Sequence, residues 1–219
     1  MTEPRSHASI AAGATTMTGI PRANYADYLA KLVRDVHAYD APDRPFVGGL
    51  LQAREIAVVH ELSSELARRG VWDVSEEIHH QHKACDLRLP LDDGTYLWLE
   101  LKQWWLCDHP AMRAWSQRNS RVVDGPPTDW ARWHGKDARP EHAANDSHAV
   151  LFICIWDDTP KAARYRDDRL AELGNEMGKV GAPAPATLPL RDAKYPVLPG
   201  GVEWYTRSGC VMVWPCASC

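Results

Sequence analysis

The sequence predicts a mixed α/β protein in which helices flank a central mixed β-sheet. Three observations carry this prediction: an amphipathic pattern near the N-terminus, closely spaced strand patterns from residue 71 onward, and a continuous apolar run at 149–156. Such a run is typical of a strand buried on both faces. Of the 219 residues, 45% are hydrophobic and 25% are charged, which excludes a disordered chain or a rod and favours a single folded domain.

Local patterns justify each element in turn. Apolar residues spaced by three and four mark the helices, and Gly70 ends the second of them. Asp92-Asp93-Gly94 and Thr206-Arg207-Ser208-Gly209 have the composition of turns, while residues 181–201 are a Pro-rich excursion. The expected elements, in chain order, are helices at 24–39 and 50–69, strands at 71–78, 84–89 and 96–103, a helix near 128, a strand at 149–156, a helix at 161–178, and a closing C-terminal β-hairpin of 202–205 and 210–214.

The ends of the chain and its charge set further expectations. Residues 1–20 are expected to form a flexible tail, and residues 21–219 one domain with its core at about 50–156. The tail lacks a signal peptide's basic start, and no apolar run reaches the roughly 18–20 residues of a membrane helix. We therefore expect a cytoplasmic protein without a membrane partner, whose six cysteines are reduced thiols. With a net charge of −4, it must meet any anionic partner through a local basic patch or a metal ion.

Charged side chains on two neighbouring strands carry the most chemical information. In the strand at 96–103, Glu100 and Lys102 share one face, whereas leucines occupy the other. Pairing through the hairpin lets Asp86 converge with them. Two nearby carboxylates repel each other unless a cation lies between them, and oxygen ligands of this kind suit Mg²⁺ or Mn²⁺. The alternative is a solvated face with a cross-strand ion pair.

The helix at 50–69 adds one more carboxylate. Glu55 falls in the middle of its apolar stripe, between Leu51 and Val59, where a charged side chain is costly. A glutamate that points from this helix toward the sheet could complete an acidic cluster. The alternative is a role near the start of the helix, where an acid suits the helix dipole.

This succession resembles the PD-(D/E)XK nuclease superfamily, which has the restriction-endonuclease-like fold with an αβββαβ core. The resemblance covers about residues 50–103 and extends to about 156, and Cys85 stands where the family often has proline. It implies Mg²⁺- or Mn²⁺-dependent hydrolysis of phosphodiester bonds. The implied roles are metal ligands for Asp86, Glu100 and the Leu101 carbonyl, positioning or activation of water for Lys102, and the helix acid for Glu55.

A basic, tryptophan-bearing stretch follows the third strand. Such a mixture could track a phosphate chain and stack on splayed bases, so we expect a nucleic acid, and specifically DNA, as partner. The alternative is that the tryptophans pack under a loop and the arginines are solvated. The residues concerned are Arg113, Trp115, Arg118, Arg121, Trp130, Arg132, Trp133, Lys136 and Arg139.

Other functions stay open at this point. The same fold could be a catalytically inactive module that binds nucleic acid or a protein. A weaker alternative is a zinc-stapled domain that uses Cys216-x-x-Cys219, and a histidine of the cluster His79, His80 and His82 could contact substrate. Because many nucleases of this fold dimerise to cut both strands, a homodimer is a further expectation of the resemblance.

Overall fold

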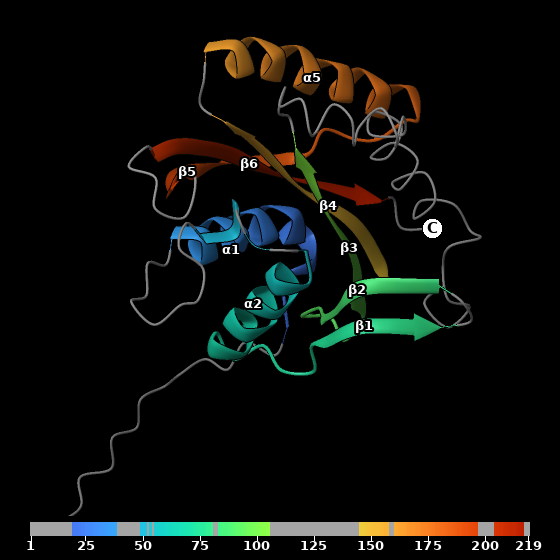
Figure 1. Ribbon diagram of the computed structural model, residues 1–219. Coiled ribbons are helices and arrows are strands. Elements are labelled where there is room, and N and C mark those ends of the chain that lie inside the picture. Colours follow the sequence, from blue (N-terminus) through green and yellow to red (C-terminus); the bar gives the residue numbers. More distant parts are fainter. Residues whose placement is uncertain are drawn as a thin grey trace, which may run out of the picture.

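A six-stranded mixed sheet lies between two layers of helices in this computed structural model (Figure 1). Helices α1 and α2 lie on one face and α5 lies on the other. The predicted mixed α/β class is thus confirmed. The structure describes residues 19–38, 49–51, 53, 55–80, 83–105, 145–157, 160–196 and 204–216.

The elements follow the predicted order through β4 and α5. The helices are η1 (Arg22–Asn24), α1 (Tyr25–Ala38), η2 (Gly49–Leu51), α2 (Glu55–Arg68) and α5 (Pro160–Lys179). The strands are β1 (Ser75–His80), β2 (Lys83–Pro90), β3 (Tyr96–Trp105), β4 (Ser147–Asp157), β5 (Ala186–Pro196) and β6 (Trp204–Cys216). The helix expected near residue 128 lies outside the described part of the chain.

The strands lie in the order β1-β2-β3-β4-β6-β5. Neighbouring strands are antiparallel except for β3 and β4, which are parallel. Strand β4 is therefore flanked on both edges, and its residues Ala149 to Trp156 are all buried. This burial confirms the interpretation of the apolar run at 149–156.

Two hydrophobic cores fill the space between the sheet and the helices. The leucines of β2 and β3 pack with α1 and α2 in the larger core. On the opposite face, Trp98, Trp104, Trp156 and Trp214 pack with the residues of α5 that face the sheet. Both faces of β3 are thus covered, so a charged residue in this strand needs a partner.

The expected C-terminal hairpin is wrong, because its two strands, 202–205 and 210–214, both overlap one strand, β6 (Trp204–Cys216), which pairs with β5 instead. β6 runs without a break through Thr206–Gly209, and β5 occupies much of the stretch expected to be a Pro-rich excursion. The turn prediction failed because β4 and β5 pair with opposite edges of β6, satisfying its backbone groups in an extended conformation. β5 tolerates Pro189 because it is an edge strand, where a missing N–H can face away from the sheet.

Close packing, and not a turn, explains why β6 has a glycine at position 209. An added Cβ would lie 2.6 Å from Leu51 Cδ2 and 2.8 Å from the carbonyl oxygen of Cys154. Leu51 belongs to η2 and Cys154 to β4, so this glycine lets β6 fit between its neighbour strand and the segment that precedes α2.

The N-terminal part of the described chain is attached to the β2–β3 hairpin. Ile20 is fully buried, and its N–H donates to the carbonyl of Pro90 at 2.8 Å. The boundary expected after residue 20 is therefore too late, because Gly19 and Ile20 already belong to the packed chain. Residues 1–18 of the expected tail lie outside the described ranges.

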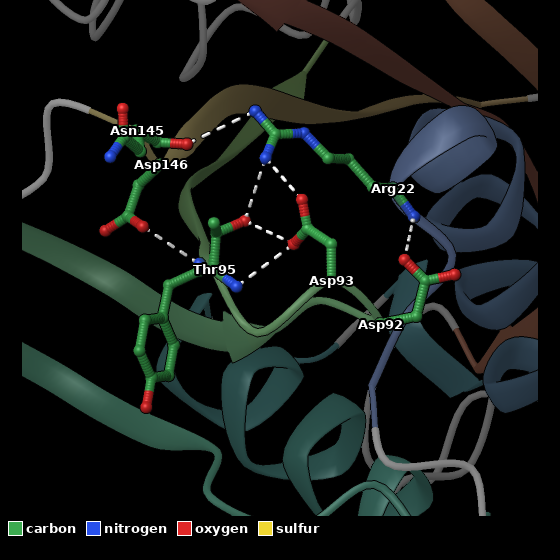
Figure 2. Close-up of polar contacts among 7 residues, drawn as sticks. Arg22, Asp92, Asp93, Thr95, Asn145 and Asp146 are labelled. Atoms are coloured by element: carbon green, nitrogen blue, oxygen red, sulfur yellow. Dashed lines mark hydrogen bonds and ion pairs between the residues drawn. The ribbon is translucent and has the colours of Figure 1, made fainter.

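Arg22 joins three segments that are distant in sequence (Figure 2). Its guanidinium binds Asp93 and donates to Thr95 Oγ1 at 3.1 Å and to the carbonyl of Asn145 at 3.2 Å. Its backbone N–H donates to Asp92 Oδ1 at 3.0 Å. Hydrogen bonds from Thr95 and Arg22 lower the pKa of Asp93 to about 2, so its carboxylate stays charged at neutral pH.

The hairpin turn is as predicted, whereas β4 begins at Ser147, two residues before the expected start at 149. The Gly94 N–H donates to the carbonyl of Leu91 at 3.1 Å, and Gly94 has φ +83°. Asp146, next to β4, accepts hydrogen bonds from the Tyr96 N–H and the Trp98 indole, which hold the beginning of β3. None of the described helices is long and apolar enough to cross a membrane.

Candidate functional site

Four side chains predicted from the sequence converge on one point of the sheet. Lys102 Nζ lies 2.8 Å from Glu100 Oε1, 3.2 Å from Glu55 Oε1 and 4.0 Å from Asp86 Oδ2. The residues come from three elements, namely β3, α2 and β2. The expected convergence is therefore present in the structure, while the roles expected of these residues stay predictions.

The antiparallel pairing of β2 with β3 brings Asp86 close to Glu100. These strands pair from Leu87/Leu99 to Pro90/Tyr96, with leucines on the side of α1 and α2. Beyond that point the N–H of Leu101 donates to the side chain of Asp86, at 2.6 Å from Oδ2. Asp86 thus satisfies a buried backbone donor of β3 and at the same time faces Lys102.

Glu55 reaches the cluster from the first turn of α2. This helix buries Val58, Val59, Leu62 and Leu66 against the sheet. Its start is thereby held beside β3, where Lys102 Nζ donates to Glu55 Oε1. The glutamate contacts an ammonium group from the sheet, which agrees with the interpretation that it completes an acidic cluster.

The charges of the cluster do not cancel. Three carboxylates surround one ammonium group, so the four side chains carry a net negative formal charge. Burial lowers the pKa of Lys102, but the neighbouring Glu100, Glu55 and Asp86 raise it more, and the net result is a raised pKa. Lys102 therefore stays protonated at neutral pH and acts as a hydrogen-bond donor.

The oxygen donors of the cluster fit a hard divalent cation in type. Asp86 and Glu100 are partly buried, with 24% and 13% of their side chains exposed, and carboxylate oxygens are the ligands that Mg²⁺ and Mn²⁺ prefer. Within the described ranges, however, no group of three His, Cys, Asp or Glu residues is arranged to hold a metal ion. The ammonium group of Lys102 lies between the carboxylates of Glu55, Asp86 and Glu100 and contacts all three.

Sequence reasoning missed one residue beside the cluster. Gln103 donates through Nε2 to the carbonyl of Ala53 at 2.8 Å and to that of Leu50 at 3.4 Å. Both carbonyls precede α2, so this amide links β3 to the start of the helix. The sequence offers one signal for this residue: strand alternation places the polar Gln103 on the same face as the apolar Leu99 and Leu101.

The other expected site residues are not placed by the structure. All of the basic and aromatic residues expected to bind nucleic acid, from Arg113 to Arg139, lie within 106–144, outside the described residues. His79 and His80 end β1, whereas His82 and Cys219 fall outside the described ranges. The described cysteines Cys85, Cys154, Cys210 and Cys216 are buried as thiols.

Two substitutions of Asp86 distinguish the contribution of its charge from that of its hydrogen bond to the backbone of Leu101. We expect Asp86→Ala to lower the free energy of unfolding by about 1–3 kcal/mol, because the buried Leu101 N–H loses its acceptor. Asp86→Asn keeps a carbonyl oxygen there and is expected to cost less than about 1 kcal/mol. Urea unfolding of both variants measures the difference. Equal losses would contradict the assigned backbone contact.

Comparisons with protein families, with curated proteins and with solved structures find no match for this chain.

Proposed function

We propose that this protein is a Mg²⁺- or Mn²⁺-dependent nuclease that hydrolyses phosphodiester bonds in DNA. The observation that carries the proposal is the convergence of Glu55, Asp86 and Glu100 on Lys102, from one helix and two strands. A net negative, partly buried group of carboxylates beside a lysine is suited to bind a divalent cation and then a phosphate. It is also the arrangement that the resemblance to PD-(D/E)XK nucleases implies.

The order of the elements supports the same proposal. α2 is followed by β1, β2 and β3, and then by β4, which lies parallel to β3. This is the succession expected of a restriction-endonuclease-like αβββαβ core, apart from its second helix, which would fall in residues 106–144. The homodimer expected from the resemblance stays a prediction.

Each residue of the cluster would have a distinct task. Asp86, Glu100 and the carbonyl of Leu101 would hold the metal ion, which when bound supplies positive charge against the charge that builds on the phosphate. Lys102, held charged by its neighbours, would donate a hydrogen bond to the attacking water or to a phosphate oxygen. Glu55 would keep the Lys102 ammonium in place through their 3.2 Å contact.

Incubation with DNA tests the proposal directly. Plasmid, linear duplex and single-stranded DNA are each incubated with the full chain in Mg²⁺, in Mn²⁺ or in EDTA. We expect cleavage with either metal, none in EDTA, and none with Glu100→Gln. The matched control is Glu176→Gln, which removes a glutamate from an ion pair on α5 and should cut normally. Cleavage that persists in EDTA or in Glu100→Gln would refute the mechanism.

One observation favours a second candidate, a catalytically inactive module of the same fold. Lys102 already forms ion pairs with the carboxylates, as a purely structural cluster would. Calorimetric titration with Mn²⁺ distinguishes the two. The nuclease should bind Mn²⁺ with heat that Asp86→Asn and Glu100→Gln abolish, whereas the inactive module should show no such heat.

A further inference from the structure

The segment that precedes α2 is held by side chains from two other elements. The N–H of Leu50 donates to Nδ1 of His37, at 3.2 Å, from the last turn of α1. The carbonyls of Leu50 and Ala53 accept hydrogen bonds from Gln103 Nε2 of β3. Leu50, Leu51 and Ala53 are themselves buried. The backbone that leads into α2 is therefore anchored to both α1 and the sheet.

Successive residues of β3 contact the two sides of this junction. Lys102 binds the carboxylate of Glu55, the first residue of α2. Gln103 binds the backbone of Ala53, two residues before Glu55, at 2.8 Å. Because Gln103 is paired with Ile153 of β4, its position in the sheet is fixed, and its amide sets how close the start of α2 lies to β3. The position of Glu55 relative to Lys102 depends on that distance.

We propose that Gln103 is a positioning residue that places Glu55 against Lys102, an inference that rests on the proposed nuclease function. The amide donor is the required group, since both of its partners are carbonyl oxygens. A methionine of similar length would remove the donor, and a glutamate would place a carboxylate against these carbonyls. In either case the backbone that precedes α2 loses its hydrogen bonds to β3, and Glu55 loses its alignment with the ammonium group.

A double-mutant cycle tests this inference through cleavage. Gln103→Met is expected to lower kcat by roughly tenfold and to leave KM nearly unchanged, as is usual when a residue that orients a site is lost. In a Glu55→Gln background the same substitution should change kcat by less than about twofold, because its effect passes through Glu55. An equal fall in both backgrounds would overturn the proposal. Should Gln103→Met not fold, Gln103→Glu enters the same cycle.

The thermal stability of the same four proteins provides a readout that needs no activity. If Gln103 holds Glu55 on Lys102, the Tm losses of Gln103→Met and Glu55→Gln are not additive, whereas additive losses overturn the inference. A wild-type chain that cuts no DNA but shows this coupling refutes the proposed function alone. Leu66→Val, at the buried far end of α2, serves as a control that lowers Tm without coupling to Glu55.

Discussion

Replacing Lys102 with methionine is expected to reduce DNA cleavage by about 100- to 1,000-fold while the fold is retained. The substitution keeps the aliphatic stem and removes the charged donor that faces Glu55, Asp86 and Glu100. A charged donor of this kind stabilises the transition state most, because the phosphate is more negative there than in the bound substrate. The loss of activity should therefore appear in kcat. Single-turnover cleavage of a labelled duplex measures it, with circular dichroism to verify folding.

The same variant should bind Mn²⁺ more tightly than the wild type. The substitution removes the ammonium group that three carboxylates share. A divalent ion then no longer competes with that group for the carboxylate oxygens. The control is Lys179→Met, which breaks the ion pair of an exposed lysine with Glu176 on α5 and should change neither measurement. Wild-type cleavage rates in Lys102→Met would eliminate the proposed role of this lysine.

Gly209→Ala is expected to lower the free energy of unfolding by about 1–3 kcal/mol. The new methyl group would meet the Cys154 carbonyl oxygen at 2.8 Å and Leu51 Cδ2 at 2.6 Å. The leucine side chain can rotate, but the carbonyl is held in the β4–β6 ladder, so the strands themselves must shift. Denaturant unfolding monitored by tryptophan fluorescence measures the loss.

Gly174→Ala is the matched control for this substitution. Gly174 lies in α5, and a Cβ added there meets no atom within 4 Å. Alanine should therefore stabilise the protein by about 0.5–1 kcal/mol, because glycine is the poorer helix former. Equal effects at the two glycines would mean that β6 is not tightly packed at residue 209.

The candidate site could be predicted because short-range periodicity determines it. Strand alternation places Glu100 and Lys102 on one face, and a tight hairpin brings Asp86 to the neighbouring strand. Helix periodicity points Glu55 toward the sheet. The first two steps need only the pairing of two consecutive strands, whereas the meeting of Glu55 with Lys102 also needs α2 to lie against β3.

The features that escaped prediction depend on contacts between distant segments. Residues Thr206–Gly209 have a turn composition, yet pairing on both edges makes them part of β6. The contact of Gln103 with Ala53 requires the placement of α2 on β3. Likewise, the hydrogen bond from the Leu101 N–H to Asp86 forms because the pairing of β2 with β3 ends at Leu87/Leu99. Local composition does not predict the partner in any of these contacts.

The bonds of Arg22 have a consequence for folding kinetics. They reach Asp92 and Asn145, which are 70 and 123 residues away along the chain, so they close very long loops. Contacts of such separation form after the local helices and hairpins, and interactions made late act on the unfolding rate more than on the folding rate. We therefore expect Arg22 to act mainly on the lifetime of the native state, so that Arg22→Ala should speed unfolding more than it slows folding.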